Sequence, residues 1–205
     1  MRSAATSLRS PGRFLLSITG LYYLPPLLIL SGLLPFAWRF QILAVITALV
    51  AIYNRRRSIG LREIGFRTDT FKDSLRIAIP ASLLLVAAMC LSARAGLVRE
   101  STAPEWKLFF AYYVFVSSPS QEFLFRGHLF ALMSRHNVGS PLARIVLSAV
   151  TFSFLHVIYR DSLTLVATLL VGLVWGWIYH RHPNFWAVTM SHAAVGAVAI
   201  QIGLI

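Results

Sequence analysis

The stretch FFAYYVFVSSPSQEFLFRGHLFALM, residues 109–133, places a carboxylate and a guanidinium inside an otherwise apolar run. The run is long enough to cross the hydrocarbon core of a bilayer as one helix. Glu122 and Arg126 are one helical turn apart, so a helix brings both charges onto the same face. Pro119 cannot donate a backbone hydrogen bond and is expected to kink this helix beside the charges. We therefore expect a membrane helix with a buried polar site.

Apolar runs of similar length recur along the chain. Of its 205 residues, 57% are hydrophobic, and the mean hydropathy is +0.70. We predict an all-α fold, a polytopic transmembrane helical bundle with about seven spans. The predicted spans are residues 14–35, 36–53, 75–97, 106–135, 142–158, 163–180 and 185–204. No small-residue cleavage site follows the first run, so we expect it to be retained as a span.

The basic residues predict how the bundle is oriented. The net charge is +12, which in a soluble protein would suggest nucleic-acid binding. Here the basic residues lie mostly between the apolar runs, a pattern typical of loops that face anionic lipid. With the N-terminus inside, about thirteen of them fall on the cytoplasmic side and about five outside. We expect a multi-pass protein of the cytoplasmic (inner) membrane of a prokaryote, with the lipid bilayer and not nucleic acid as its partner.

Two histidines lie deep inside predicted spans. At about 1.5 Å per residue, Glu122 and His156 are roughly 20 Å into their spans and His192 about 12 Å into its own. Three helices therefore bring a carboxylate and two imidazoles to similar depth, and ionisable residues at such depth usually face the bundle interior. The remaining histidines are expected near helix ends or the interface: His128, His136, His180 and His182.

These residue types in this arrangement favour hydrolytic chemistry. A buried carboxylate near an imidazole can activate a water molecule, and a second imidazole can donate to the oxyanion of a tetrahedral intermediate. Arg126 can hold Glu122 ionised and oriented, and Phe152, one turn before His156, sets an aromatic ring beside the imidazole. Two structural alternatives stay open: Glu122 and Arg126 as a purely structural ion pair, and His156 as a bridging hydrogen-bond donor.

Three motifs resemble those of the CAAX-protease and bacteriocin-processing (CPBP, Abi/Rce1-like) family of intramembrane proteases. They are QEFLFRG, then FSFLH, then LVGLVWGWIYHRHPNFWAVTMSHAAVGA, and together they cover about residues 105–204. Glu122 and Arg126 match the second Glu and the Arg of the family's Glu-Glu-x-x-x-Arg motif. Phe152 and His156 match its Phe-x-x-x-His motif. The resemblance implies that His156 assists water activation and that His192, the late histidine, stabilises the oxyanion.

The chain departs from the family pattern at two positions. Gln121 stands where the family has its first Glu, often assigned as the water-activating residue, and Gly196 stands where an Asn is expected. Gln121 cannot act as a base. Either Glu122 takes that role, or the protein is weakened or inactive as a protease.

The sequence therefore predicts a CPBP-type intramembrane endopeptidase that acts on a membrane-embedded or membrane-associated peptide. The alternative is a catalytically weakened member that binds a membrane peptide as an immunity or scaffolding protein. A small transporter with Glu122 as its proton site is disfavoured, because no second carboxylate lies deep in a span.

We also predict how the chain is divided and whether the protein uses a cofactor. Residues 1–104 are expected to supply the N-terminal spans and a basic cytoplasmic loop, and residues 105–205 the protease core. The resemblance favours a metal-free mechanism without a cofactor. The alternative is zinc held by Glu122, His156 and His192, which are residue types that zinc accepts.

Overall fold

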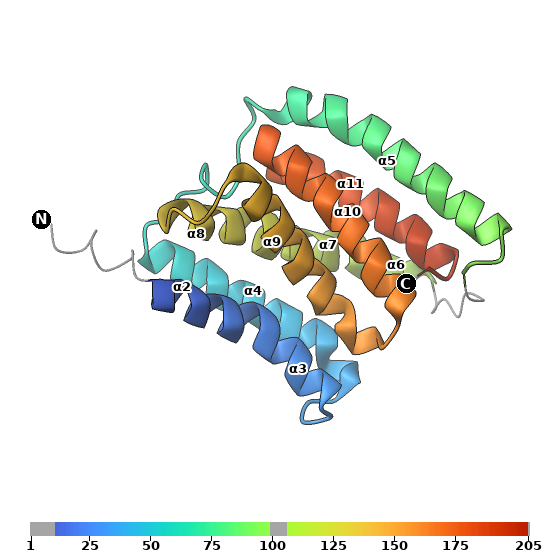
Figure 1. Ribbon diagram of the computed structural model, residues 1–205, viewed down its shortest axis with the longest axis horizontal. Helices are drawn as coiled ribbons and strands as arrows, with labels where there is room; N and C mark the ends of the chain where they lie inside the picture. The colour runs from blue at the N-terminus through green and yellow to red at the C-terminus, as the bar shows by residue number, and fades with distance from the viewer. Residues whose placement is uncertain (1–10, 99–105, 205) are drawn as a thin grey trace, which may run out of the picture.

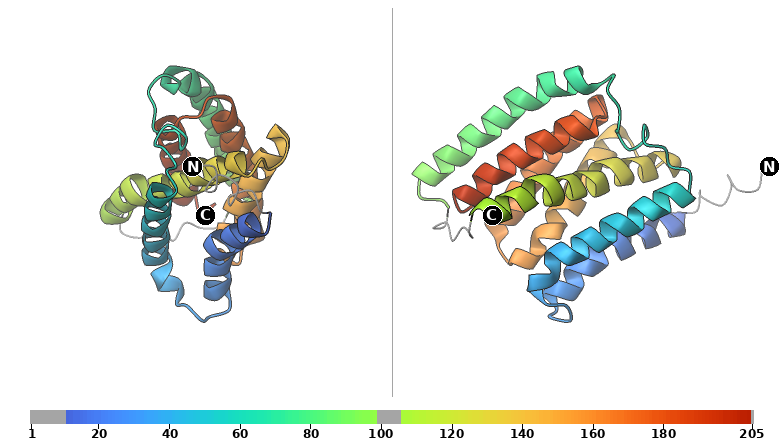
Figure 2. Two further views of the ribbon diagram at one scale, coloured as in Figure 1. Left: turned by 90° about the vertical axis from the view of Figure 1, so that its left-hand side faces the viewer. Right: turned by 180° about the vertical axis from the view of Figure 1, so that it is seen from behind.

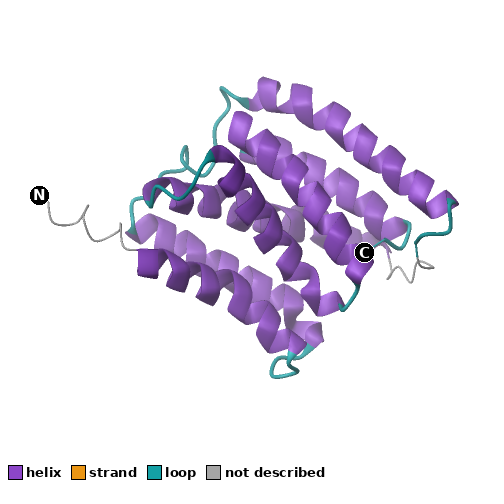
Figure 3. Ribbon diagram, viewed as in Figure 1, coloured by secondary structure: helices purple, strands orange, loops and turns teal. Residues whose placement is uncertain are grey.

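The computed structural model describes residues 11–98 and 106–204 (Figure 1). Within these residues it contains seven helical rods and no strand (Figure 3), so the all-α prediction is confirmed. The rods, in chain order, are α2 (Pro11–Ile18) with α3 (Leu24–Leu30), α4 (Arg39–Arg56), α5 (Phe71–Arg94), α6 (Trp106–Tyr112) with α7 (Ser118–Glu122) and α8 (Leu129–Arg135), α9 (Pro141–Leu155), α10 (Ser162–Arg181) and α11 (Phe185–Gln201).

Four of the rods are long and apolar enough to cross a membrane. They are Phe36–Arg56, Phe71–Arg94, Pro141–Tyr159 and Ser162–Arg181. Two shorter apolar helices, Phe14–Leu30 and Phe185–Gln201, pack with them. The predicted spans 14–35 and 185–204 are therefore shortened at their C-terminal ends, while the other predicted spans agree with the rods to within a few residues.

Two of the rods contain π-helical segments. Thr19–Tyr23 joins α2 to α3, while Tyr113–Ser117 and Phe123–His128 join α6 to α7 and α7 to α8. Pro119 lies in the first turn of α7, directly after one such segment, where its missing N–H costs least. The distortion expected beside Pro119 is therefore present as wide turns on both sides of α7, and wide π turns often occur at functional sites.

The central rod, from α6 to α8, runs between α11 on one side and α4 on the other (Figure 2, right). α5 packs along the far side of α11, and the hydroxyls of Ser82 and Ser191 bond across that interface at 2.7 Å. α9 and α10 approach closely because Gly172 has no side chain: a Cβ there would lie 3.1 Å from the Cα of Ala149. The central rod is thus surrounded by the elements that complete its polar site.

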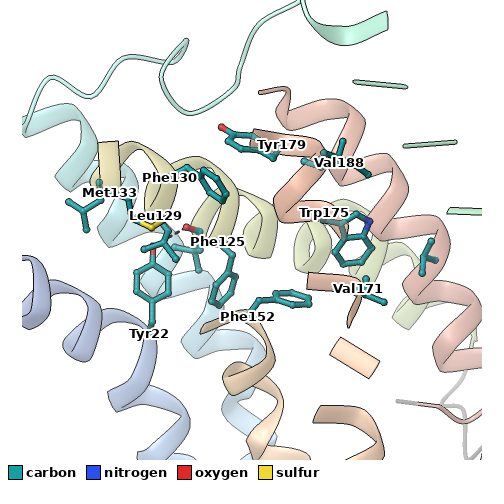
Figure 4. Close-up of a cluster of buried hydrophobic side chains, with 14 of the residues drawn as sticks. Tyr22, Phe125, Leu129, Phe130, Met133, Phe152, Val171, Trp175, Tyr179 and Val188 are labelled. Carbon is teal, nitrogen blue, oxygen red and sulfur yellow. Dashed lines mark hydrogen bonds between the residues drawn. The ribbon is translucent and has the colours of Figure 1, made fainter. Parts of the chain in front are cut away.

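Helices from both ends of the sequence share one hydrophobic core. Tyr22, in the π segment of the first rod, packs against Phe125 of the central rod with ring centroids 5.3 Å apart (Figure 4). Its hydroxyl donates to the carbonyl of Leu124 at 2.9 Å. The same cluster extends through Phe152 and Trp175 to Leu204. The first rod therefore helps to fix the central rod in place.

The loop between α4 and α5 docks onto the ends of α10 and α11. Gly65 adopts a left-handed φ of +82°, and its carbonyl accepts a hydrogen bond from the N–H of Phe185 at 2.8 Å. The rings of Phe66 and Phe185 stack with centroids 4.1 Å apart. Asn184 donates to the carbonyl of Arg67 at 2.7 Å while its Oδ1 caps α11. This docking anchors the start of α11, the helix that carries His192.

A second anchor fastens the loop to the end of α8. Arg135 donates to the carbonyls of Arg57 and Ser58 at 2.8 and 2.7 Å, and to both carboxylate oxygens of Glu63. The hydrogen bonds from Arg135 hold the pKa of Glu63 below its ordinary value. Because this pair is partly exposed, its contribution to stability is small.

Replacing Gly65 tests the docking of this loop. A Cβ at Gly65 would lie 2.6 Å from the hydroxyl of Tyr179 and 3.0 Å from the N–H nitrogen of Phe185. We expect Gly65→Ala to lower the free energy of unfolding by about 1–3 kcal/mol, because strain in the left-handed region adds to the clash. Gly60→Ala is the matched control, since the nearest atom to its Cβ is Glu63 Oε1 at 3.6 Å. Equal unfolding curves for both variants in detergent micelles would contradict the expectation.

Candidate active site

Glu122 is fully buried at the end of α7 and joins two helices through one oxygen. Its Oε1 accepts a hydrogen bond from Arg126 Nη1 at 3.1 Å and another from His192 Nδ1 at 2.6 Å. Its Oε2 has no hydrogen-bond partner among the described residues. The structure thus brings together three of the residues that the sequence singled out, on the central rod and α11.

Arg126 is also fully buried and is held by three further groups. Its Nη2 donates to the carbonyl of Gly172 on α10 at 3.3 Å. Its guanidinium lies 4.4 Å from the ring centre of Phe152 and 5.4 Å from that of Trp175, so both rings can stabilise the cation. The charge inside the bundle is therefore paired with a carboxylate and enclosed by π faces and a carbonyl.

Glu122 fixes the tautomer of His192. A carboxylate only accepts hydrogen bonds, so the hydrogen in this contact belongs to His192 Nδ1, and the neutral ring keeps its lone pair on Nε2. Trp175 stacks on the imidazole, with centroids 4.4 Å apart and planes tilted by 20°. The indole is itself held, because its Nε1 donates to Ser191 Oγ at 2.9 Å. The orientation of His192 is thus determined by a carboxylate and a stacked ring.

His156 lies where α9 gives way to a 3₁₀ turn, His156–Tyr159. Its Nδ1 donates to the carbonyl of Phe152 at 3.0 Å, so its neutral ring also keeps the lone pair on Nε2. The ring of Phe152 lies 5.0 Å from that of His156 and 5.6 Å from that of His192. Phe152 is therefore adjacent to both imidazoles as well as to the guanidinium of Arg126.

A cavity of about 480 Å³ opens beside these rings, a size that suits a small-molecule or side-chain ligand. His156 and His192 both line it, and Phe152 and Trp175 form part of its wall. Most other lining residues are aliphatic or aromatic, and they come from α4, the central rod, α9, α10 and α11. The cavity therefore presents two imidazoles in an otherwise largely apolar chamber.

The adjacent residues Gln121 and Glu122 face different surroundings. Gln121 lines the cavity, whereas Glu122 does not and points toward Arg126 and His192. Gln121 Nε2 donates to Ser117 Oγ at 3.0 Å, and its Oε1 has no partner among the described residues. The position where the family pattern has its first Glu thus faces the cavity, and here it carries an amide.

Other predicted residues have specific places as well. Gly196 lines the cavity one turn after His192 on α11. His128, expected near the interface, is instead fully buried, because Asn54 of α4 supplies a polar partner at 2.7 Å from its Nδ1. In the described part of the chain, no three His, Cys, Asp or Glu side chains lie together as a metal site.

Sequence reasoning missed five polar or charged residues of the cavity wall: Arg39, Tyr113, Ser117, Tyr159 and Thr168. Tyr113 and Tyr159 line it with their rings, and Arg39 contributes a guanidinium that lies 4.1 Å from the ring centre of Phe36. Arg39 lies near the start of its predicted span, where polar side chains are ordinary, and Tyr113 is one of several aromatic residues in its own span. The residue that could have indicated Tyr113 is Gly196, since a glycine facing a bulky side chain leaves room for it.

The comparisons with known proteins agree with the motif-based resemblance. Residues 103–198 match the family model described as Type II CAAX prenyl endopeptidase Rce1-like. No curated protein and no solved structure matches the chain. The matched segment contains Glu122, His156 and His192. A match to a membrane protease family, together with four long apolar helices, identifies an integral membrane protein.

Replacing Arg126 tests whether the buried pair stabilises the bundle. Arg126→Met would leave Glu122 as an unpaired buried charge, so we expect the free energy of unfolding to fall by about 3–5 kcal/mol. Glu122→Gln combined with Arg126→Met removes both charges and is expected to cost less than Arg126→Met alone.

Unfolding by denaturant in detergent micelles measures these differences. Arg62→Met is the matched control, because the ion pair of Arg62 with Asp69 is exposed and its loss should change stability little. If the double variant were less stable than Arg126→Met, charge pairing would not be what holds this site together.

Proposed function

Residues 103–198 belong to the Rce1-like family of type II CAAX prenyl endopeptidases, and from this premise we propose that the protein is an intramembrane endopeptidase. The observation that carries the proposal is the hydrogen bond from His192 Nδ1 to Glu122, which leaves the Nε2 of a cavity-lining imidazole free to accept a proton. A base held in its tautomer by a buried carboxylate is a recurrent arrangement for activating a nucleophile.

The proposed reaction attacks a peptide carbonyl with a water molecule. His192 Nε2 takes a proton from the water, and the water oxygen bonds to the carbonyl carbon to form a tetrahedral intermediate. His156 Nε2 accepts a hydrogen bond from the same water and orients it. His192 then gives its proton to the leaving amine nitrogen, and the carbon–nitrogen bond breaks. Glu122 acts through His192 as a positioning residue and stabilises the imidazolium while it exists.

Arg126 contributes electrostatics rather than contact with the substrate. It forms an ion pair with Glu122, whose negative charge would stabilise the imidazolium of His192 after proton transfer. Charges buried beside a largely apolar cavity act on a bound peptide more strongly than charges in bulk water. The apolar wall of the cavity suits a peptide segment that enters from the bilayer.

The membrane orientation is part of the proposal. Basic side chains gather at one end of the bundle, near the ends of α4, α8 and α10. We propose that this end lies on the cytoplasmic side of a prokaryotic inner membrane, as the positive-inside rule favours. His156 follows the last residue of α9 and is separated from this basic end by the length of that helix. We therefore propose that cleavage takes place inside the bilayer.

Cleavage by protein reconstituted in liposomes tests the function. The probe is an internally quenched, farnesylated peptide ending in a CAAX sequence, and the same peptide without the farnesyl group shows whether the lipid is required. We expect His192→Ala, His156→Ala and Glu122→Gln each to lower kcat by about 10²–10⁴-fold, because each removes the proton acceptor or its orientation. Glu63→Gln and His180→Ala, which replace the same residue types outside the cavity, are the controls. Unchanged rates in Glu122→Gln and His156→Ala would rule out this mechanism.

A second function is favoured by one observation, the amide of Gln121 on the cavity wall. A chamber without a carboxylate at that position could hold a membrane peptide without cutting it, as an immunity or scaffolding protein. Gln121→Glu distinguishes the two functions. If the protein is an endopeptidase, a cavity-facing carboxylate adds a second base and should raise the cleavage rate by about 10-fold or more. If it only binds, neither the wild type nor Gln121→Glu should cleave, while Glu122→Gln should leave peptide binding intact.

A further inference from the structure

Gly196 and Tyr113 compete for the same space in the cavity wall. A Cβ added to Gly196 would lie 1.7 Å from the hydroxyl oxygen of Tyr113 and 2.8 Å from its Cζ. Real Cβ atoms do not approach other atoms so closely, so a side chain at position 196 would force the ring of Tyr113 to move. Any residue other than glycine at 196 would therefore displace the hydroxyl. Gly196 therefore leaves the space that the hydroxyl of Tyr113 occupies.

The hydroxyl lies on the side of the cavity where His192 is located. Gly196 follows His192 by one turn of α11, so both positions share a face of that helix. The ring of Tyr113 meets that of His192 edge-on, with centroids 6.1 Å apart. Tyr113, His192 and Gly196 all line the same cavity. A carbonyl carbon attacked by water held at His192 would therefore carry its oxygen close to this hydroxyl.

The proposed hydrolysis requires a donor at that place. The developing oxyanion needs a preorganised N–H or O–H, and a tyrosine hydroxyl can supply one. His192 directs its N–H at Glu122 and so presents an acceptor to the cavity. Gln121 Nε2 and Trp175 Nε1, two of the other donors on the wall, already donate to Ser117 and Ser191. Arg39 Nη1, a third, donates to the carbonyl of Phe36. Arg126 does not line the cavity.

We propose that Tyr113 is a catalytic residue whose hydroxyl donates a hydrogen bond to the carbonyl oxygen of the scissile peptide and to the oxyanion it becomes. Gly196 is the positioning residue that leaves room for this hydroxyl. The proposal rests on the endopeptidase function. It gives the two residues a joint role: the central rod supplies the donor, Tyr113, and Gly196 on α11 leaves space for it. The π turn that begins at Tyr113 aims the ring into the cavity from the central rod.

Tyr113→Phe removes the hydroxyl and keeps the ring, and the farnesylated quenched peptide in liposomes reports the rate. We expect kcat to fall by about 10²–10³-fold with KM and the melting temperature unchanged, as for loss of one oxyanion donor. Tyr112→Phe is the matched control: Tyr112 is the preceding residue, does not line the cavity, and should keep full activity. Full kcat in Tyr113→Phe would overturn the proposal and leave the endopeptidase function standing. A loss of kcat matched by an equal loss of stability would do the same. Absence of cleavage by the wild type overturns both.

A rescue experiment tests the shared space directly. Gly196→Asn alone should abolish activity, because its side chain collides with Tyr113. Tyr113→Ala opens that space, and adding Gly196→Asn to it places an amide donor where the hydroxyl was. We expect the double variant to regain at least 10-fold in kcat over Tyr113→Ala, which is part of the roughly 10²–10³-fold that one donor contributes. A double variant no faster than Tyr113→Ala would overturn the assignment of a donor role to this place.

Discussion

One carboxylate oxygen holds the polar interior of this bundle together. Oε1 of Glu122 accepts from Arg126 on its own rod and from His192 on α11, and Arg126 reaches on to α10. In the apolar interior of a membrane, Glu122 and Arg126 have no alternative polar partner. The central rod, α10 and α11 must therefore keep one arrangement for the ion pair and its hydrogen bonds to persist. The orientation of His192, the stacking of Trp175 and the wall of the cavity all follow from that requirement.

Two neighbouring residues of the central rod have different roles: Glu122 neutralises Arg126, and Gln121 faces the cavity. Glu122 does not line the cavity, and its Oε1 accepts from Arg126 and His192 while its Oε2 has no partner among the described residues. Gln121 does line the cavity, and its Oε1 likewise has no partner there. A carboxylate that must neutralise a guanidinium is poorly suited to bind a substrate as well. Reactivity in the cavity therefore depends on His156 and His192, with Glu122 exerting its influence through the ring of His192.

The sequence was sufficient to predict the rods and the depth of the polar residues, because hydropathy and the rise per residue determine both. The pairing of Glu122 with Arg126, and the ring of Phe152 beside His156, likewise follow from one-turn spacing. The rotation of α7 about its own axis could not be predicted. The sequence left open whether Gln121 or Glu122 faces the cavity, since the π segments on both sides of α7 change its phase without a periodic signal. The burial of His128 depends on Asn54, a partner far away in the chain.

The π segments at Tyr113–Ser117 and Phe123–His128 have a consequence for how chains of this kind diverge in length. Each wide turn holds about one residue more than an α-helical turn, so a single insertion or deletion can be absorbed there while the helix beyond it keeps its orientation. Gaps of one residue in an alignment are usually assigned to loops between spans. Here they would belong inside a span, and moving one would exchange which of two adjacent side chains meets the cavity.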